Sequence, residues 1–502
     1  MKRQADSDSD GGGGGLFAED ELPAGWCEGV FSFDAMELDE AAGHATFLFS
    51  HRDSCSGTAL ARFQTALHLP QPCPLWPAGA AAAALAVGLA SLPWLWLGVP
   101  CRRIAVRAAL LTPEQCSFWA ATYNGCCAEF FALNGFALPD GAGVSVECDT
   151  SARPLSPRQG AARVGLPPGS TPLEHRVLVP LGGGKDSLTT WELLRPLPVA
   201  KRWLYVEDDA GEFAANWRLA ALVVASGAPD PALVATHCWR DAGWEAYRRR
   251  RYRLVGHPWA ALVACTAALV ALVHSYDAIA VGNERSAGEG NGCYQGVAVN
   301  HQHDKSLAFE RPCAAYFRAH LHPGLAYFSC LAHLWEVQVA QRFCAPAVAR
   351  RYLRLFTSCN EAATSSHPSR ACAACAKCLF VSLLLTAFLE HPAEAICYAG
   401  DDLLQGMALA PLLAALLDPD QSNKPLDCVG SARESALCVA RAAASYRRHG
   451  LAVPALLVGA LDAGVAATAA EAESMLVASD GPHGIPDWAA DACGADERFR
   501  VP

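Results

Sequence analysis

Residues 176–187 read R-V-L-V-P-L-G-G-G-K-D-S, and the chain continues as L-T-T-W-E-L-L. An apolar run therefore ends at three glycines, after which Lys185 opens a segment that is compatible with a helix. Successive N–H groups in such a turn form a concave nest for an anion, and the helix N-terminus adds the positive end of its dipole. The stretch predicts a strand, a phosphate-binding turn and a helix, which is the beginning of an α/β nucleotide-binding fold.

The loop is not a Walker A motif, because that pattern requires Ser or Thr after the lysine and Asp186 stands there instead. It resembles the pyrophosphate (PP) loop of ATP-pyrophosphatases, usually S-G-G-x-D-S, with Gly182 in place of the serine. The resemblance implies an ATP-binding domain of the HUP type that splits ATP between its α and β phosphates. The nucleotide would be held by Gly182, Gly183, Gly184, Lys185, Asp186 and Ser187. The alternative is an ordinary glycine-rich turn, and the trailing Asp186 and Ser187 favour the PP loop.

The composition of the whole chain limits the classes of protein to which it can belong. The chain has 502 residues, a net charge of −11 and 22 cysteines. Its length suits two or three domains, and its acidity argues against nucleic-acid binding. One basic cluster, at residues 248–251 and Arg253, is typical of a solvated helix end, with a contact to substrate phosphate as the alternative. We expect a reduced cytoplasmic protein, with a plastid location left open, because no secretory signal accompanies the cysteines.

Changes of pattern along the chain predict five regions. We expect an acidic, Gly-rich disordered tail at 1–27, an N-terminal α+β substrate-associated domain at 28–150 and a linker at 151–172. A PP-loop ATP-binding α/β domain with a parallel sheet would occupy 173–345, and a mostly helical, Cys-rich region would occupy 346–502. The apolar stretches at 78–100 and 259–273 are interpreted as buried helices rather than membrane spans.

Three polar segments follow predicted strands: the glycine loop, residues 207–209, and residues 282–291, which read G-N-E-R-S-A-G-E-G-N. Ligands of parallel sheets bind at the carboxyl ends of the strands, so these segments should meet in one crevice. Asn283 is a predicted contact to the nucleotide, and Glu284 is a candidate acid or base.

Residues 300–310 read N-H-Q-H-D-K-S-L-A-F-E and place two histidines, a lysine and an aspartate within five positions. Such a cluster suits acid–base chemistry or contact with phosphate. His301 and Lys305 are the favoured proton-transfer residues, while His303 and Glu310 are further candidates. The alternative is that the segment only grips phosphates.

Four cysteines, Cys359, Cys372, Cys375 and Cys378, follow the pattern C-x12-C-x2-C-x2-C. Four thiolates that converge tetrahedrally are the ligands of a structural Zn²⁺ site, and an iron–sulfur cluster is the second reading. We expect this site to lie away from the chemistry.

Taken together, the motifs resemble one family. They are V-P-L-G-G-G-K-D-S, G-N-E-R-S-A, V-N-H-Q-H-D-K-S, F-S-C-L, S-C-N with C-x2-C-x-K-C-L-F, N-K-P-L-D-C-V-G, the upstream Y-N-G-C-C-A-E-F-F-A-L-N and a late H-G-I-P. The set, which spans about residues 28–490, is similar to the UDP-N-acetylmuramoyl-L-alanyl-L-glutamate epimerases. This implies an isomerase that uses ATP and Mg²⁺ to adenylate and invert the terminal L-glutamate of a nucleotide-sugar dipeptide during peptidoglycan synthesis. AMP and diphosphate would be released.

Three places depart from the family pattern. His303-Asp304 stands where Tyr-Ser is usual, Cys126-Cys127 replaces a Gly-Leu-like pair, and Ala373 stands where glycine follows the first cysteine of the triplet. These changes concern substrate specificity more than ATP chemistry.

Adenylation makes chemical sense for such a reaction, because the enolate of a free carboxylate would carry two negative charges. Activating the carboxyl removes one charge, so that a side-chain base can take the α-proton. His301, Lys305 and Glu284 are the leading candidates for the acid and the base, with His303 and Glu310 as further candidates. Gly183 and Gly184 should tolerate no side chain. Two other classes stay open: another PP-loop enzyme that adenylates a nucleoside or tRNA, and a non-catalytic nucleotide sensor.

Overall fold

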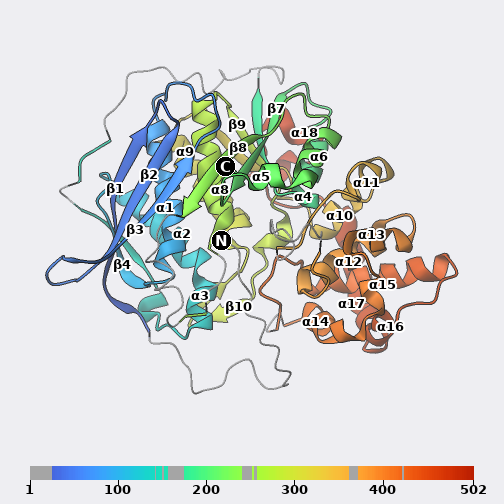
Figure 1. Ribbon diagram of the computed structural model, residues 1–502. Coiled ribbons are helices and arrows are strands. Elements are labelled where there is room, and N and C mark those ends of the chain that lie inside the picture. Colours follow the sequence, from blue (N-terminus) through green and yellow to red (C-terminus); the bar gives the residue numbers. More distant parts are fainter. Residues whose placement is uncertain are drawn as a thin grey trace.

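The computed structural model describes residues 25–141, 143–149, 152–155, 175–239, 252–253, 257–360, 371–420 and 423–501. The predicted tail up to residue 24, most of the predicted linker and the basic residues 248–251 lie outside the described residues. Within them the chain is a mixed α/β structure, with a large sheet on one side and a group of helices on the other (Figure 1).

Ten strands form one sheet in the order β12-β9-β6-β7-β8-β3-β2-β1-β4-β5. Pairing is parallel from β12 to β8 and from β1 to β5, and antiparallel from β8 through β3 and β2 to β1. The strands are β1 (Cys27–Asp39), β2 (His44–Arg52), β3 (Ala59–His68), β4 (Cys101–Val106), β5 (Ser145–Cys148), β6 (Arg176–Pro180), β7 (Ala200–Glu207), β8 (Leu233–Trp239), β9 (Ala278–Val281) and β12 (Ala326–Ser329). A separate hairpin joins β10 (Gly292–Tyr294) to β11 (Val297–Val299).

The helices fall into two groups along the chain. The first group is α1 (Ala80–Trp96), α2 (Pro113–Cys126), α3 (Ala128–Leu133), α4 (Lys185–Leu193), α5 (Glu212–Ala215), α6 (Trp217–Ala225), α8 (Trp259–Val273) and α9 (Leu307–His320). The second is α10 (Glu336–Phe343), α11 (Pro346–Tyr352), α12 (Ala376–Phe388), α13 (Ile396–Ala399), α14 (Ala410–Leu416), α15 (Ala432–Arg448), α16 (Ala455–Asp462), α17 (Val465–Ala472) and α18 (Asp487–Cys493). Helices α12 to α17 lie together beside the sheet, while α18 returns to it (Figure 1).

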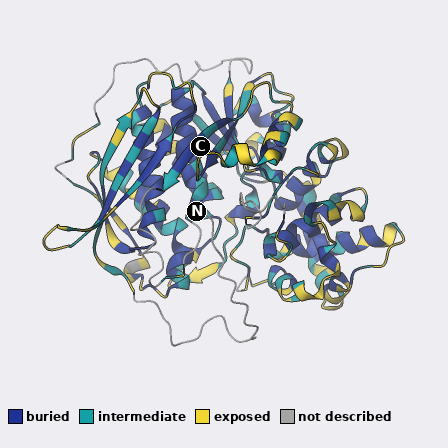
Figure 2. Cartoon of the chain, in the orientation of Figure 1, coloured by how far each residue is buried: buried dark blue, intermediate teal, exposed yellow. Residues whose placement is uncertain are grey.

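Strand β6 shows how the sheet is buried on both faces. Val177 and Val179 belong to the core shared with α4, α6 and α10 to α12, whereas Leu178 between them belongs to the core shared with α1, α8 and α9. Successive side chains of a strand point to opposite faces, so a continuous apolar run is what a doubly covered strand needs. Figure 2 shows the resulting dark layer of buried residues through the sheet. The predicted strand, turn and helix at 176–193 are confirmed.

The antiparallel pairing of β3 with β8 joins the two halves of the sheet, with Thr65 opposite Trp239 and His68 opposite Thr236. The predicted N-terminal α+β domain and the predicted ATP-binding domain therefore share one sheet. The two apolar stretches that were interpreted as buried helices are α1 and α8, and both are largely buried. No single described helix combines the length and apolar character that crossing a membrane requires; only the sharply bent pair at 455–462 and 465–477 meets those criteria jointly.

Candidate active site

The glycine loop connects β6 to α4 at the carboxyl end of the parallel strands. Gly183 has φ +75°, a left-handed conformation that side-chain-bearing residues rarely adopt, as predicted for a residue that must stay glycine. Gly184 differs from the prediction: its backbone is extended, and an added Cβ would lie 3.4 Å from the Thr357 carbonyl oxygen, an ordinary contact. The protein's own atoms therefore leave room for a small side chain at Gly184, and also at Gly182. No side chain caps the N-terminus of α4, which begins at Lys185.

The Lys185 ammonium is buried in a cluster of carboxylates. Its Nζ lies 2.5 Å from Asp186 Oδ1 and 2.5 Å from Glu336 Oε1. Burial disfavours the charged lysine, but Asp186, Glu336 and Glu284 outweigh that effect and raise the pKa of Lys185. The side chain is therefore a fixed positive charge at the mouth of the glycine loop.

Glu284 completes this cluster. One carboxylate oxygen from each of Asp186, Glu284 and Glu336 lies within 4.8 Å of the others, an arrangement of hard oxygen ligands that suits Mg²⁺. Burial, with Asp186 nearby, raises the pKa of Glu284 to about 7, although Lys185 and Lys305 oppose the shift. The approach of the two loops depends on Gly282, where an added Cβ would lie 2.8 Å from the Asp186 carbonyl oxygen. The predicted meeting of the glycine loop with residues 282–291 is confirmed.

Two other predicted residues beside this cluster, Asn283 and Ser187, form hydrogen bonds within the protein through their backbone or hydroxyl group. The Asn283 N–H donates to Ser329 Oγ at 2.8 Å, and Ser329 Oγ donates to the Asn283 carbonyl at 2.7 Å. Ser187 Oγ donates to the Gly184 carbonyl at 3.1 Å and so tightens the first turn of α4. Glu207 lies at the end of β7 as predicted, but its carboxylate accepts from the N–H groups of Gly211 and Phe213 and so closes its own loop.

A second group surrounds His301. His301 Nδ1 lies 2.6 Å from Glu129 Oε2 of α3, and Lys305 Nζ donates to Cys428 Sγ at 3.2 Å. Burial opposes protonation of His301, yet hydrogen bonds with Cys428 and Glu129 raise its pKa to about 10. The Cys428 thiolate is the largest cause that raises the pKa of Lys305, and Glu284 adds to it. Lys305 therefore hydrogen-bonds with Cys428 and also interacts electrostatically with Glu284 of the carboxylate cluster.

The remaining members of residues 300–310 serve other purposes. Asp304 Oδ2 accepts from the N–H groups of Ala260 and Ala261 and so caps the first turn of α8. Glu310 is buried in α9, where burial raises its pKa to about 8, and its Oε2 has no hydrogen-bond partner among the described residues. Neither residue contacts the carboxylate cluster in the described structure.

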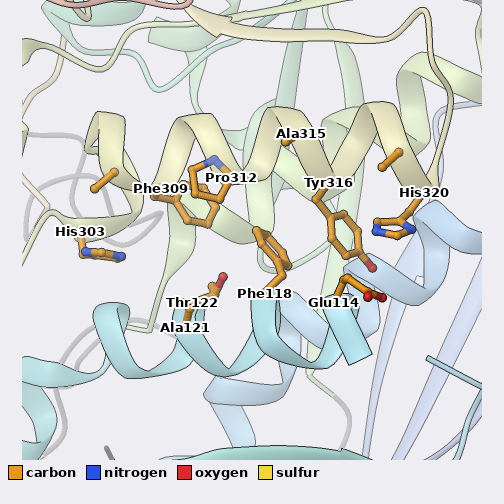
Figure 3. Close-up of a pocket in the computed structure, with 12 residues that line it drawn as sticks. Glu114, Phe118, Ala121, Thr122, His303, Phe309, Pro312, Ala315, Tyr316 and His320 are labelled. Atoms are coloured by element: carbon orange, nitrogen blue, oxygen red, sulfur yellow. The ribbon is translucent and has the colours of Figure 1, made fainter. Parts of the chain in front are cut away.

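His303 lies in a different cavity. The cavity has a volume of about 510 Å³ between α2 and α9, and its walls are mostly apolar, with Phe118, Phe309 and Tyr316 among them (Figure 3). The ring packs against Gly125, where an added Cβ would lie 2.2 Å from His303 Nε2. Burial lowers the pKa of His303, which makes it a neutral packing residue rather than part of the polar site.

The four predicted metal ligands come together. The Sγ atoms of Cys359, Cys372, Cys375 and Cys378 all lie within 4.8 Å of one another, and the Cys372 and Cys378 sulfurs are 3.8 Å apart. Zn–S bonds of about 2.3 Å in a tetrahedron require sulfur separations of roughly 3.8 Å. The Cys372 N–H donates to Cys359 Sγ and the Cys378 N–H to Cys375 Sγ, as thiolate ligands need. The cysteines therefore fit a tetrahedral metal.

The expectation that this cysteine group lies away from the chemistry is wrong. The Thr357 N–H donates to the Gly183 carbonyl at 2.9 Å, only two residues before Cys359. On the other side, the Lys377 N–H donates to Asp427 Oδ2 at 3.3 Å, next to Cys428. The cysteine group thus supports the glycine loop and the Cys428 segment together.

Ala373, which stands where the family pattern has glycine, adopts a backbone conformation that favours glycine. Its φ is +61°, in the left-handed region.

Four residues of the site were not predicted as such: Glu129, Glu336, Asp427 and Cys428. Glu129 and Cys428 lie inside motifs that carry the family resemblance, Y-N-G-C-C-A-E-F-F-A-L-N and N-K-P-L-D-C-V-G, and that signal could have identified them. Glu336 begins α10 without any surrounding motif.

Comparisons with known proteins agree with the motifs. The family model described as the MurL N-terminal domain matches residues 27–330, and the MurL C-terminal domain matches residues 355–475. Three similar proteins carry the name UDP-N-acetyl-alpha-D-muramoyl-L-alanyl-L-glutamate epimerase. The one from Xanthomonas oryzae pv. oryzae (strain MAFF 311018) is 32% identical over 273 residues, 53% of this chain and 57% of its own length.

Two further similar proteins come from other organisms and carry the same name. That from Micromonospora sp. (strain ATCC 39149 / NRRL 15099 / SCC 1413) is 31% identical over 64% of this chain and 70% of its own length. That from Salinispora tropica (strain ATCC BAA-916 / DSM 44818 / JCM 13857 / NBRC 105044 / CNB-440) is 30% identical over 68% of this chain and 71% of its own length.

Proposed function

Because this chain belongs to the MurL family, we propose that it is an ATP-dependent epimerase of UDP-MurNAc-L-Ala-L-Glu. It would adenylate the α-carboxyl of the terminal L-glutamate, invert the α-carbon and release D-glutamyl product with AMP and diphosphate. The observation that carries the proposal is that two groups of polar side chains meet near the carboxyl ends of the parallel strands. A phosphate-type loop with a buried lysine lies next to a histidine–thiol group, and Lys305 interacts electrostatically with both Glu284 and Cys428.

The glycine loop suits the triphosphate. The left-handed turn at Gly183 and the uncapped start of α4 present backbone N–H groups to an anion, and Lys185 adds a full positive charge. In the free protein this charge is neutralised by Asp186 and Glu336. We infer that phosphate oxygens replace part of this pairing when ATP binds, so that Lys185 stabilises the negative charge that develops on diphosphate.

The carboxylate cluster fits a divalent cation, because oxygens of Asp186, Glu284 and Glu336 lie within 4.8 Å of one another. Glu336 is also buried, and its Oε2 has no hydrogen-bond partner among the described residues. Mg²⁺ held there would neutralise phosphate charge during adenylation. The carboxylates also explain why Lys185 stays charged in a buried place, because without them its ammonium would be strongly disfavoured.

The proton transfers would use the His301 group together with Glu284 of the carboxylate cluster. His301 has a pKa near 10, held up by Cys428 and Glu129 against burial, so its imidazolium can donate a proton at neutral pH. Glu284, with a pKa near 7, can act in either direction. Lys305 stays an ammonium ion and suits stabilisation of the enolate charge better than removal of a proton.

We also propose that Cys359, Cys372, Cys375 and Cys378 hold a structural Zn²⁺ ion. Their convergence and the two N–H···S hydrogen bonds support a tetrahedral thiolate site. Through Thr357 and Lys377, this site would fix the positions of the glycine loop and of Asp427.

The test is a reaction with purified protein, ATP, Mg²⁺ and UDP-MurNAc-L-Ala-L-Glu, in which AMP and D-glutamate are both quantified. We expect one AMP for each D-glutamyl residue formed. A parallel panel of nucleosides and tRNA should give no AMP. AMP formed only with one of these acceptors would refute the proposal in favour of another adenylating enzyme, and no AMP with any acceptor would favour a nucleotide sensor.

A further inference from the structure

Inversion of an α-carbon needs a group that is already deprotonated on one side of the substrate. Of the three predicted acid–base residues, His301 and Lys305 are both held in their cationic forms, and Glu284 stands among the carboxylates beside the glycine loop. We propose that Cys428 is the base that removes the α-proton, acting as a thiolate held by His301 and Lys305. This inference rests on the epimerase function proposed above.

The geometry is that of an activated thiol. Lys305 Nζ lies 3.2 Å from Cys428 Sγ, and one side-chain atom from each of His301, Asp427 and Cys428 lies within 4.8 Å of the others. Glu129 Oε2, 2.6 Å from His301 Nδ1, orients the imidazole from α3. A thiol beside a histidine that a carboxylate orients is a usual arrangement of a reactive cysteine.

The segment that carries Cys428 is fastened across the site. Lys424 Nζ donates to the Glu289 carbonyl at 3.1 Å, and Asn291 Nδ2 donates to the Pro425 carbonyl at 3.2 Å. Gln302 Nε2 donates to the Val429 carbonyl at 3.2 Å. These bonds place the thiol over the loops at 282–291 and 300–305, so Cys428 is held in the crevice by contacts on both sides of it.

The charges around the sulfur favour the thiolate. Three cations lie near it: His301 and Lys305 of the loop at 300–305, and Lys377 of α12. The nearby carboxylates have other partners, since Glu129 pairs with His301 and Asp427 accepts from the N–H groups of Lys377 and Cys428. Burial opposes ionisation, but the cations outweigh it and lower the pKa of Cys428 to about 6.

The proton balance of the step is simple. Cys428 Sγ forms an S–H bond as the Cα–H bond of the adenylated glutamyl residue breaks, and the electron pair moves onto the activated carboxyl as an enolate. A donor on the opposite face then forms the new Cα–H bond and collapses the enolate. Exchange with water returns the thiol and the donor to their first states, and no oxidant or reductant is consumed.

The first experiment separates adenylation from proton transfer in the full-length enzyme. Diphosphate–ATP exchange reports adenylation, and deuterium entry at the glutamyl α-carbon in D₂O reports deprotonation. We expect Cys428→Ser to keep adenylation within about threefold and to lose deuterium entry by a factor on the order of 10² or more, the scale of one general base. Cys438→Ala, a buried cysteine in α15, is the matched control and should change neither rate.

Each other outcome has a defined meaning. Normal deuterium entry in Cys428→Ser would overturn the inference. Wild-type protein without diphosphate exchange would instead overturn the proposed function, so the two failures are distinguishable. A covalent substrate adduct on Cys428 in the mass spectrum of the working enzyme would overturn the base role, because the sulfur would then be a nucleophile.

A second experiment tests the thiolate without any reaction. The rate of Cys428 carboxamidomethylation by iodoacetamide, followed by peptide mass spectrometry, should rise around pH 6 rather than near the ordinary thiol pKa of about 8.5. In His301→Gln the midpoint should move upward, because one of the three cations is lost. An ordinary midpoint in the wild type, or an unchanged midpoint in His301→Gln, would contradict the inference.

Discussion

Replacing Lys185 with methionine separates the stabilising and the catalytic roles of the buried charge cluster. The side chain is only 3% exposed, and its ammonium lies 2.5 Å from both Asp186 Oδ1 and Glu336 Oε1. Asp186 is partly open to solvent, but Glu336 is buried, so Lys185→Met leaves the Glu336 carboxylate without its cation. Breaking a buried pair by removing one partner costs about 3–5 kcal/mol. Glu336 can lower that cost by taking up a proton, because burial already raises its pKa well above the usual value. We therefore expect a loss near 3 kcal/mol in the free energy of unfolding, at the lower end of this range.

The double variant Lys185→Met with Glu336→Gln is the matched control. Removing both charges should recover about 2 kcal/mol of that loss, measured as a coupling energy by urea unfolding of all four proteins. Catalysis should not recover, since the transferring phosphates still lack their cation. We expect diphosphate–ATP exchange to fall by about 10² to 10³ in both variants. A single variant with wild-type unfolding and wild-type exchange would refute the reasoning, and so would a double variant that regains exchange.

Three further predictions follow from particular residues. Ala373→Gly should raise the melting temperature of the protein, because glycine adopts the left-handed backbone at φ +61° without strain. The expected gain in the free energy of unfolding is about 1 kcal/mol, and no gain would mean that the turn is unstrained. Cys359→Ser should abolish bound zinc in elemental analysis. It should also slow diphosphate–ATP exchange, because the Thr357 N–H near Cys359 donates to the Gly183 carbonyl. A zinc-free variant with normal exchange would show that the cysteine group does not support the glycine loop. Glu310→Gln should be more stable than the wild type by an amount that grows from pH 5 to 8, measured by thermal unfolding. Burial raises the pKa of the Glu310 carboxyl in the folded protein to about 8. Its stabilising contribution is therefore complete below the unfolded pKa, near 4.5, and is lost as the pH rises through 8. A stability difference between Glu310→Gln and the wild type that does not depend on pH would contradict this.

Local patterns predicted the parts of the site that are built from neighbouring residues. The glycine loop and the start of α4 follow from one unbroken stretch, because a tight turn between a buried strand and a helix needs only local contacts. The cysteine group could be predicted for the same reason, since three of its ligands share one short segment. Residues 30–38 and 45–51, within the region predicted to be α+β, likewise lie in strands, β1 and β2.

Contacts between distant segments could not be predicted in this way. Glu129 and His301 are 172 positions apart, and Lys305 and Cys428 are 123 positions apart, so no local periodicity brings them together. The same limit applies to the antiparallel pairing of β3 with β8, which joins regions that the composition separates. His303 shows the opposite error, since a polar residue in a promising motif turned out to face an apolar cavity (Figure 3).

Deuterium incorporation during turnover tests the central claim, inversion of an adenylated glutamyl carbon, most directly. The wild-type enzyme would convert UDP-MurNAc-L-Ala-L-Glu in D₂O with ATP and Mg²⁺, and the product would be analysed for chirality, α-deuterium and AMP. Inversion of the adenylated carbon predicts D-glutamyl product with one deuterium at its α-carbon and one AMP for each inversion. D-glutamyl product that retains its α-protium, or deuterated product formed without AMP, would contradict it.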